Sequence, residues 1–318
     1  MKTKIVLSVV SGEYDIYLAQ ALIAVYTARK HNPFTEIVLV VDNDTVKVIN
    51  EKLPKIKEFL SDIIVADVPI GMSKMLRSRY LKTTLRKIIK GDYLFVDTDT
   101  VIVGDLSSID HLDADIAAVL DRHTSVSLHV CRNQIIKQVS LCSLNEKDLR
   151  DMYFNSGVMY VKDTPIAHLL YEKWHESWSK SWRLNKGIDQ PSLALANKLC
   201  GYPIVELNGI WNCQLADNFI NYLYDAKILH YFASNHSSPY RLYDNYIFAD
   251  VMKVGDIPYK LAMALDNPKS YFKEHHQLIY DDDIKFMRSK IHVIFKYHSS
   301  VFRMIEYISK VIITRKLW

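Results

Sequence analysis

The stretch Asp92-Tyr-Leu-Phe-Val-Asp97-Thr98-Asp99-Thr-Val-Ile-Val103 contains an apolar run, two carboxylates one residue apart and a second apolar run. The unbroken aromatic and branched residues from Tyr93 to Val96 predict a short buried strand. Asp97 and Asp99 follow where that strand ends, and residues i and i+2 of an extended chain point to the same side. Both carboxylates can therefore face one cation, and their oxygen atoms suit Mg²⁺ or Mn²⁺.

Strand-like and helix-like segments alternate before this stretch. The expected strands are Ile5–Val10, Ile37–Val41 and Ile63–Val65, and the expected helices are Ile16–His31, Asn43–Leu53 and Ser73–Ile89. Asn43 or Asp44 is the expected cap of the second helix, and Ser73 that of the third. This alternation predicts an α/β fold with an open, mostly parallel central sheet flanked by helices. Ligands of such sheets bind beyond the carboxyl ends of the strands, where Gly12, Asp42 and Asp97 lie.

The second half of the chain continues the pattern less regularly. Its expected elements are a strand at Ile116–Leu120, a polar and irregular region at His123–Arg150, a strand within Tyr153–Val161, an amphipathic helix at Thr164–Trp182, a helix opened by Asp189-Gln190-Pro191 and a strand at Ile228–Phe232. Pro191 fits the first turn of a helix, where its missing N–H costs nothing. The indoles of Trp174, Trp178 and Trp182 fall on one helical face, which favours packing in a core or an interface.

Composition limits the classes of protein that fit. The 318 residues are enough for one large or two small domains, and 49% hydrophobic and 24% charged residues are typical of globular proteins. The net charge is +4, but residues 284–318 alone carry +7 and the rest carries −3. A nucleic-acid-binding body is therefore not expected. Four cysteines without C-x-x-C spacing predict reduced thiols and a cytoplasmic location. The first apolar run is too short for a signal peptide. No segment reaches the roughly 20 apolar residues that a membrane-spanning helix needs.

Five short motifs in order resemble glycosyltransferase family 8, which includes bacterial lipopolysaccharide galactosyl- and glucosyltransferases and glycogenin. Asp97-Thr98-Asp99 resembles the family's D-x-D element, Asn155-Ser-Gly-Val its N-(S/A)-G-V element and Asp189-Gln190 its D-Q element. Trp211-Asn212 resembles the W/Y-N element, and His230-Tyr231 resembles the start of an H-(Y/F)-x-G-x-x-K-P-W signature. The resemblance covers roughly the first 240 residues.

The resemblance implies a GT-A fold and a retaining transferase that uses a UDP-sugar and Mn²⁺, with Mg²⁺ as the alternative. Carried over by motif, the implied metal ligands are Asp97, Asp99 and His230, the implied donor-binding residues are Ser8, Gly12, Asp42, Arg79, Asp97, Thr98 and Asp99, and the residues that line the donor-sugar pocket are Asn155, Asp189 and Gln190. Arg77 competes with Arg79, because a slip of two residues in the alignment exchanges them. Asp121 can bind a sugar hydroxyl or cap a helix, and His230 taken alone would be read as a core histidine.

The resemblance also implies an acceptor and a mechanism. The acceptor would be a saccharide or glycolipid of lipopolysaccharide or another cell-surface glycan, bound beside residues 123–150. Gln190 lies where the family's candidate nucleophile or stabiliser falls, and an amide is a poor nucleophile, so electrostatic support and same-face attack are expected. The chain departs from the family after His230-Tyr231, because the lysine that would meet a diphosphate oxygen is absent. His236 or Arg241 can substitute for it.

The basic tail predicts a second functional segment. We expect a glycosyltransferase domain at residues 1–265 and a basic helical segment at 266–318. Between residues 284 and 318, apolar and basic side chains occupy adjoining helical arcs, with a break at His298-Ser299-Ser300. Such a segment suits an anionic membrane surface, which would place the protein at the inner face of the cytoplasmic membrane. The alternative is a helix packed on the body with a solvated basic face.

Two other functions fit parts of the sequence. Residues 95–101 also satisfy the first motif of haloacid-dehalogenase-like phosphatases, with Asp97 as nucleophile. That motif normally follows the first strand of a core, whereas three strand-like segments precede Asp97 here. A non-catalytic nucleotide-sugar-binding protein of the same fold is the other alternative, and the altered sequence after His230 is its best support.

Overall fold

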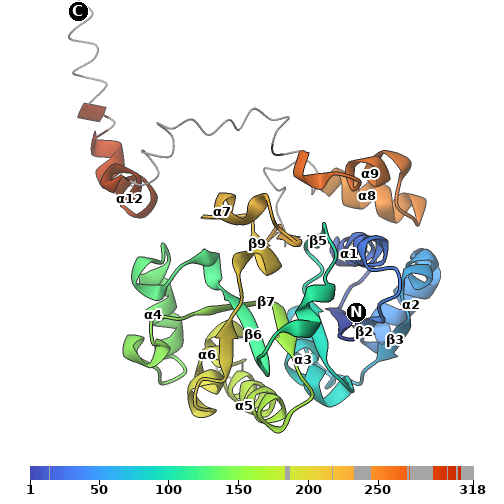
Figure 1. Cartoon of the computed structure of the whole chain (residues 1–318), viewed down its shortest axis with the longest axis horizontal. Coiled ribbons are helices and arrows are strands. Elements are labelled where there is room, and N and C mark those ends of the chain that lie inside the picture. The colour runs from blue at the N-terminus through green and yellow to red at the C-terminus, as the bar shows by residue number, and fades with distance from the viewer. Residues whose placement is uncertain are drawn as a thin grey trace, which may run out of the picture. The chain divides into compact units, whose positions relative to one another are not determined.

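The computed structural model describes residues 1–13, 15–182, 187–216, 218–232, 245–270, 272, 289–298, 300–305 and 307–308. The chain divides into two compact units, Met1–Tyr271 and Phe272–Trp318 (Figure 1). The domain boundary expected between residues 265 and 266 stays a prediction, because compactness alone does not define a functional domain. Within the described ranges, no helix is long and apolar enough to cross a membrane.

The first unit is built on a seven-stranded sheet of order β3-β2-β1-β4-β7-β6-β8. These strands are β1 (Lys4–Val9), β2 (Ile37–Val41), β3 (Asp62–Val65), β4 (Tyr93–Val96), β6 (Ile116–Leu120), β7 (Phe154–Val161) and β8 (Ile204–Glu206). β7 runs antiparallel to β4 and β6, and the other neighbouring strands are parallel. The predicted mostly parallel α/β sheet is therefore confirmed.

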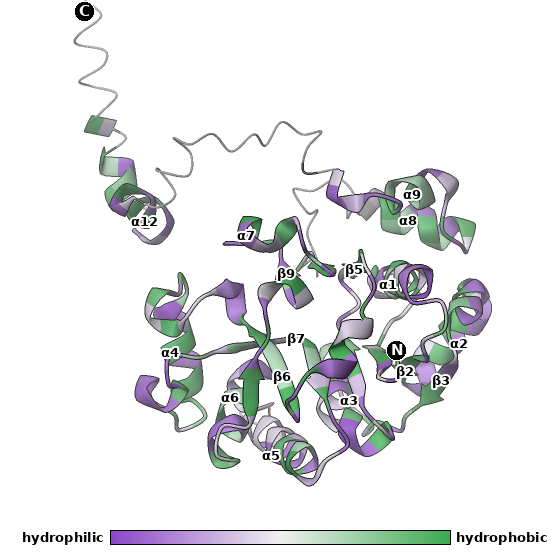
Figure 2. Cartoon of the chain, in the orientation of Figure 1, coloured by the Kyte–Doolittle hydropathy of each residue, from purple (hydrophilic) through white to green (hydrophobic). Residues whose placement is uncertain are grey.

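Helices cover both faces of this sheet. They are α1 (Tyr17–His31), α2 (Asn43–Lys52), α3 (Lys74–Ile88), α5 (Pro165–Trp182) and α6 (Gln190–Leu199). The α3, α5 and α6 helices share one core with the strand residues Val6, Val38 and Val40. Side chains alternate along a strand, so the buried Ile5 and Leu7 point to the opposite face, where α1 contacts β1 (Figure 1). Figure 2 shows the strands mainly in hydrophobic colours, as burial on both faces requires.

A small second sheet has the order β5-β10-β9. Its first strand follows the acidic motif directly, and His230, the predicted metal ligand, ends β10. Its strands are β5 (Thr100–Ile102), β9 (Cys213–Gln214) and β10 (Ile228–His230). β10 is antiparallel to β5, with His230 opposite Thr100, and the Tyr231 N–H donates to the Asp99 carbonyl at 2.9 Å. This register brings His230 beside Asp99 although they are 131 positions apart in sequence.

Two local expectations were wrong. Residues 123–150, expected to be irregular, contain α4 (Arg132–Ser140), because Ile135 and Val139 lie one helical turn apart and are buried in a small core. The α2 helix is capped by Asp42 rather than by Asn43 or Asp44, since the Asp42 carboxylate accepts from the Thr45 N–H at 2.9 Å.

The remaining α-helices of the described part of the chain come after β9 in sequence. They are α7 (Ile220–Leu223), α8 (Asn245–Val254), α9 (Tyr259–Ala264) and, in the second unit, α12 (Lys290–Tyr297). Ser289 caps α12, and the helix ends at His298, where a break was expected. Residues 300–305 are helical again.

Candidate active site

Asp97, Asp99 and His230 form a compact group at the carboxyl end of β4. One ligand atom of each lies within 4.8 Å of the others. His230 Nε2 is 3.1 Å from Asp99 Oδ1, and the histidine side chain is 3% exposed. Two carboxylates and one imidazole suit a divalent cation, and the imidazole shifts the preference from Mg²⁺ toward Mn²⁺. The predicted metal ligands are thus brought together in a donor set that fits the implied ion.

The absence of a side chain at Gly157 leaves space for His230 and Asp97. The Asp97 N–H donates to the Gly157 carbonyl at 2.7 Å, so β7 passes directly beside the carboxylates. A Cβ on Gly157 would overlap Cε1 of His230 and lie 3.0 Å from Asp97 Oδ2. The glycine of the N-S-G-V motif is therefore required by close approach of the backbone to the site.

Two basic side chains of α3 reach the same place. Lys82 Nζ lies 3.0 Å from both carboxylate oxygens of Asp97 and 3.9 Å from Asp189 Oδ2. Arg79 Nε lies 2.9 Å from Asp189 Oδ1. Lys82 is three residues after Arg79 and therefore on the same helical face. We did not predict Lys82 as a site residue, and its position on the helix relative to Arg79 was the signal available for it.

Arg77, the competitor of Arg79, points elsewhere. Its guanidinium lies 2.6 Å from Asp42 Oδ2 and 2.7 Å from Asp44 Oδ2. These residues line a separate hollow of about 350 Å³, together with residues 68–72. Asp42 is fully buried there. The structure therefore separates Arg79, beside Asp189, from Arg77, beside Asp42.

A cavity of about 440 Å³ opens in front of the acidic motif. It is lined by Ser8, Val9, Val10, Asp15, Tyr17, Gln20, Lys74, Met75, Ser78, Arg79, Asp97, Thr98 and Asp99. Five predicted donor-binding residues, Ser8, Arg79, Asp97, Thr98 and Asp99, are in this lining. Gly12 and Asp42 are not. The Gly12 N–H instead donates to Asp15 Oδ2 at 2.8 Å, and Asp15 itself lines the cavity.

Charge within the site is unevenly distributed. Burial raises the pKa of Asp97 despite Lys82, whereas the pKa of Asp99 is lowered, because attraction to His230 outweighs its burial. The pKa of His230 is raised, since Asp99 offsets the cost of burying the cation. The pKa of Asp189 is lowered because Arg79 and Lys82 outweigh burial. The site therefore keeps Asp99 and Asp189 ionised in a buried setting.

Two of the predicted sugar-pocket residues, Asp189 and Asn155, are held by hydrogen bonds close to this group. Ser156 Oγ donates to Asp189 Oδ2 at 3.1 Å, and Trp174 Nε1 donates to the Asp189 carbonyl at 2.9 Å. The packing role expected for Trp174 is confirmed by its complete burial. Asn155 Nδ2 donates to Asp121 Oδ1 at 2.9 Å.

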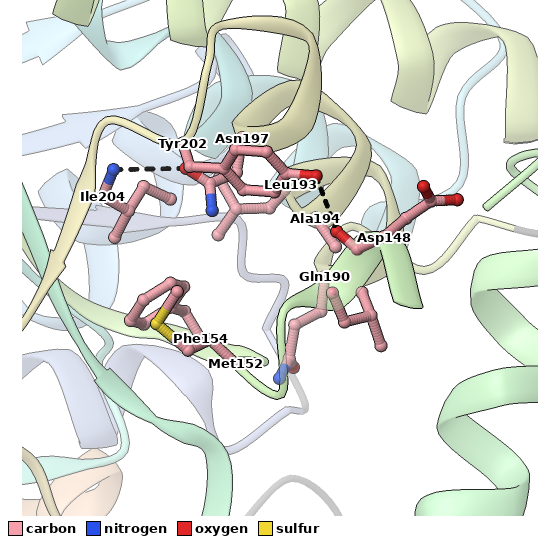
Figure 3. Close-up of a pocket in the computed structure, with 10 residues that line it drawn as sticks. Asp148, Met152, Phe154, Gln190, Leu193, Ala194, Asn197, Tyr202 and Ile204 are labelled. Atoms are coloured by element: carbon pink, nitrogen blue, oxygen red, sulfur yellow. Dashed lines mark hydrogen bonds between the residues drawn. The ribbon is translucent and has the colours of Figure 1, made fainter. Parts of the chain in front are cut away.

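Gln190 lies at the start of α6, between Asp121 and a small cavity. Its interaction with Asp121 helps to hold the pKa of that carboxyl low. Its Nε2 is buried and has no hydrogen-bond partner of normal geometry in the described part of the chain. The cavity has a volume of about 10 Å³ and is lined by Gln190 with Asp148, Phe154 and Tyr202 among others (Figure 3). This cavity is too small to hold a sugar. The functional contact of Gln190 is therefore the one that it makes with Asp121.

Residues 9–236 match Glycosyl transferase family 8. The chain belongs to this family. Among solved structures, GlyE of Streptococcus pneumoniae TIGR4 in its apo form has a TM-score of 0.51 at 16% identity, with 86% of this chain and 64% of GlyE covered. The bifunctional glycosyltransferase WbbM has a TM-score of 0.51 at 14% identity, with 83% of this chain and 51% of WbbM covered. The chain thus spans about half to two-thirds of these proteins. No curated protein matches the chain in sequence.

The family match and these fold likenesses confirm the predicted GT-A fold and identify the chain as a glycosyltransferase. Family membership sets aside the phosphatase alternative. The order of the strands agrees, since the acidic motif follows β4, the fourth strand of the chain rather than the first.

Proposed function

We propose that this glycosyltransferase moves a hexose from a UDP-sugar to a saccharide acceptor with retention of anomeric configuration. The observation that carries the proposal is the Asp97, Asp99 and His230 group, whose two carboxylates line a cavity of about 440 Å³. Mn²⁺ is the cation that this donor set favours, and Mg²⁺ is the alternative. Nucleotide-sugar enzymes commonly share such a cation between the protein and the substrate phosphates.

Lys82 and Arg79 supply fixed positive charge to the same proposed donor site. Lys82 is only 4% exposed and lies against Asp97, so its ammonium is held at the edge of the acidic motif. We assign to it the diphosphate contact for which the family's usual lysine is missing. The other candidates, His236 and Arg241, lie outside the described residues. Ser8 and the neighbouring end of β1 line the cavity and are proposed to hold the uridine, with Gly12 acting through Asp15, which accepts its N–H and also lines the cavity.

The bound cation would act as a Lewis acid that offsets negative charge on the leaving UDP. Asp189 is an orienting group rather than a nucleophile, because Arg79 and Ser156 each engage one of its carboxylate oxygens. Gln190 follows it directly and offers an amide oxygen, which stabilises positive charge at an oxocarbenium-like centre but is a poor nucleophile. These residues support attack by the acceptor on the same face from which UDP leaves.

The acceptor is proposed to be a saccharide or glycolipid of lipopolysaccharide or another cell-surface glycan. Residues 123–150 are the proposed acceptor side, because His129 contacts Asp121 at 3.1 Å and Asp121 contacts Asn155. These contacts support an acceptor side next to the proposed sugar pocket. Asp121 keeps its proposed role in binding a sugar hydroxyl, since each carboxylate oxygen can accept a further hydrogen bond.

Donor hydrolysis tests the proposed activity. A set of UDP-hexoses is incubated with the full chain and Mn²⁺, and UDP release is measured. We expect release from at least one donor, its loss with a chelator, and a sugar product whose anomeric configuration, followed by NMR, matches the donor. Calorimetric binding of UDP with Mn²⁺ but no turnover of any donor would instead support a non-catalytic binding protein.

The second unit is proposed to bind an anionic membrane surface, which would hold the enzyme at the inner face of the cytoplasmic membrane. α12 contains no buried residue, and Ile291, Val293 and Phe295 are each 46–53% exposed. Lys290 and Lys296 lie on the same helix. Apolar side chains enter the headgroup region, and each basic residue near it contributes about 1 kcal/mol.

Flotation with liposomes tests this membrane proposal on the full-length chain. We expect binding to vesicles that contain phosphatidylglycerol and its loss when Lys290, Lys296 and Arg303 are replaced by Glu. Replacement of Lys47, Lys55 and Lys57 on the surface of the first unit by Glu is the matched control and should leave flotation unchanged. Equal flotation of all three proteins would remove the membrane role.

A further inference from the structure

A chain of hydrogen bonds leads from His230 to His129 through the interior. His230 Nδ1 lies 2.9 Å from Asn212 Oδ1, and Asn212 Nδ2 donates to Asn155 Oδ1 at 3.0 Å. Asn155 Nδ2 donates to Asp121 Oδ1 at 2.9 Å, and Asp121 Oδ2 lies 3.1 Å from His129 Nε2. Asn212 is fully buried, and both histidines and Asn155 are at most 5% exposed. Their polar atoms therefore depend on one another rather than on solvent.

The direction of each bond near His230 is fixed by groups that have only one role. The Gly157 N–H can only donate, and it donates to Asn155 Oδ1 at 2.9 Å. The Asp121 carboxylate can only accept, so it receives the Asn155 amide nitrogen. The Asn155 oxygen therefore accepts from the Asn212 amide nitrogen, which leaves the Asn212 oxygen facing His230. His230 Nδ1 must then carry a proton and donate.

The far end of the chain is fixed in the same way. The Cys131 N–H donates to His129 Nδ1 at 2.9 Å, so that nitrogen is an acceptor. The proton of His129 is then on Nε2, which donates to Asp121. Hydrogen bonds from His129 and Asn155 outweigh burial and keep the pKa of Asp121 low. Asp121 remains an acceptor, and this keeps the Asn155 nitrogen turned toward it.

We propose that Asn212, Asn155, Asp121 and His129 are positioning residues that hold His230 with Nδ1 protonated. The Nε2 lone pair is then directed into the group formed with Asp99, where a divalent cation binds. This relay rests on the proposed metal site and assigns a function to Asn212 and His129. Partners that orient a metal-ligating histidine in this way typically change metal affinity 10–100-fold when they are lost.

Mn²⁺ binding without nucleotide tests the relay independently of turnover. Free Mn²⁺ is measured by electron paramagnetic resonance, and coordination by an imidazole nitrogen is detected by pulsed measurements on the bound ion. We expect Asn212→Leu to bind Mn²⁺ about 10–100-fold more weakly and to lose the nitrogen signal. Asn212→Asp still accepts from His230 Nδ1 but loses the hydrogen bond to Asn155 Oδ1, so it should keep the nitrogen signal and lose less affinity than Asn212→Leu.

Asn197→Leu is the matched control for the loss of a buried asparagine. Asn197 is 6% exposed, and its Oδ1 accepts from the Ile204 N–H at 3.2 Å, outside the relay (Figure 3). It should lose stability without losing Mn²⁺ affinity. At the far end, His129→Leu should weaken binding several-fold, and His129→Gln, whose amide nitrogen can donate to Asp121, should restore it. This second pair decides the question if Asn212→Leu does not fold.

The outcomes separate the relay from the metal site. Unchanged affinity and nitrogen signal in Asn212→Leu and His129→Leu, with both lost in His230→Ala, would overturn the relay alone. Absence of Mn²⁺ binding by the wild-type chain would overturn the metal site and the relay with it.

Discussion

Replacement of Lys82 by Met tests the central ion pair of the site. Met keeps most of the volume of the buried side chain and removes its charge. Lys82 Nζ is 3.0 Å from both oxygens of Asp97 and 5.0 Å from the centre of the Phe95 ring. Removal of one partner of a buried ion pair costs about 3–5 kcal/mol, because the other charge stays buried without compensation. The Asp97 side chain is 30% exposed, so solvent offsets part of the loss. We therefore expect a loss of about 3 kcal/mol in metal-free protein.

Added Mn²⁺ should reverse part of this loss. Ligand at 100 times its Kd stabilises a folded protein by about 2.7 kcal/mol. In the variant the cation no longer competes with the Lys82 ammonium for Asp97, so it should bind more tightly than in the wild type. The variant should therefore gain more unfolding free energy from a given Mn²⁺ concentration, while UDP-sugar turnover falls because a proposed diphosphate contact is lost.

Urea unfolding followed by tryptophan fluorescence measures both effects. Trp174 and Trp178 are fully buried in the first unit, so their emission reports on the unfolding of that unit. Lys173→Met is the control, because Lys173 pairs with Glu176 at the surface and its loss should leave the midpoint unchanged. An unfolding free energy of Lys82→Met equal to that of the wild type without metal would show that the buried pair does not form in solution.

Three further outcomes follow from single contacts. Asp99→Asn should abolish Mn²⁺-dependent transfer and leave the circular dichroism spectrum unchanged; full activity would refute the metal assignment. Gly157→Ala should cost about 1–3 kcal/mol by overpacking against His230 and weaken Mn²⁺ binding at least tenfold, whereas Gly104→Ala, whose nearest neighbour lies at 4.0 Å, should do neither. Burial lowers the pKa of His123 from 6.5 to about 4. Between pH 6.5 and 4 His123 is therefore protonated in the unfolded chain and neutral in the folded chain. The free energy of unfolding is highest above pH 6.5 and falls by up to about 3 kcal/mol as the pH drops toward 4. His123→Asn, which tolerates the φ of 56° at this position, should flatten that slope in urea titrations, and an unchanged slope would contradict the assignment.

The order of elements in the first unit was predictable because hydrophobic periodicity and capping residues are local signals. Ser73 caps α3, and Pro191 lies in the first turn of α6, as expected. The α4 helix was missed because its apolar face is small, consisting mainly of Ile135 and Val139. Those residues are buried only against a local core that the linear pattern does not display. Tertiary packing supplied what the sequence pattern lacked.

The candidate site was predictable to a different degree for each kind of residue. Asp97, Asp99 and His230 were recognisable because motifs mark them, and the antiparallel register of β10 on β5 then brings them together. Lys82 has no such mark, since a lysine on a helix is usually solvated. What makes Lys82 special is the burial of its ammonium between carboxylates from other elements, and burial is a property of the fold.

The same argument explains why the relay behind His230 was not predictable. The four links join residues that are 8 to 57 positions apart, and the bond directions depend on backbone donors at Gly157 and Cys131. Sequence motifs record the side chains that meet the substrate, whereas the orientation of those side chains is set by neighbours whose identity is constrained only by hydrogen-bond geometry. The missing lysine after His230-Tyr231 is therefore weak evidence against catalysis. Positive charge and a correctly oriented imidazole are both present, but they are supplied by α3 and by the interior rather than by the motif.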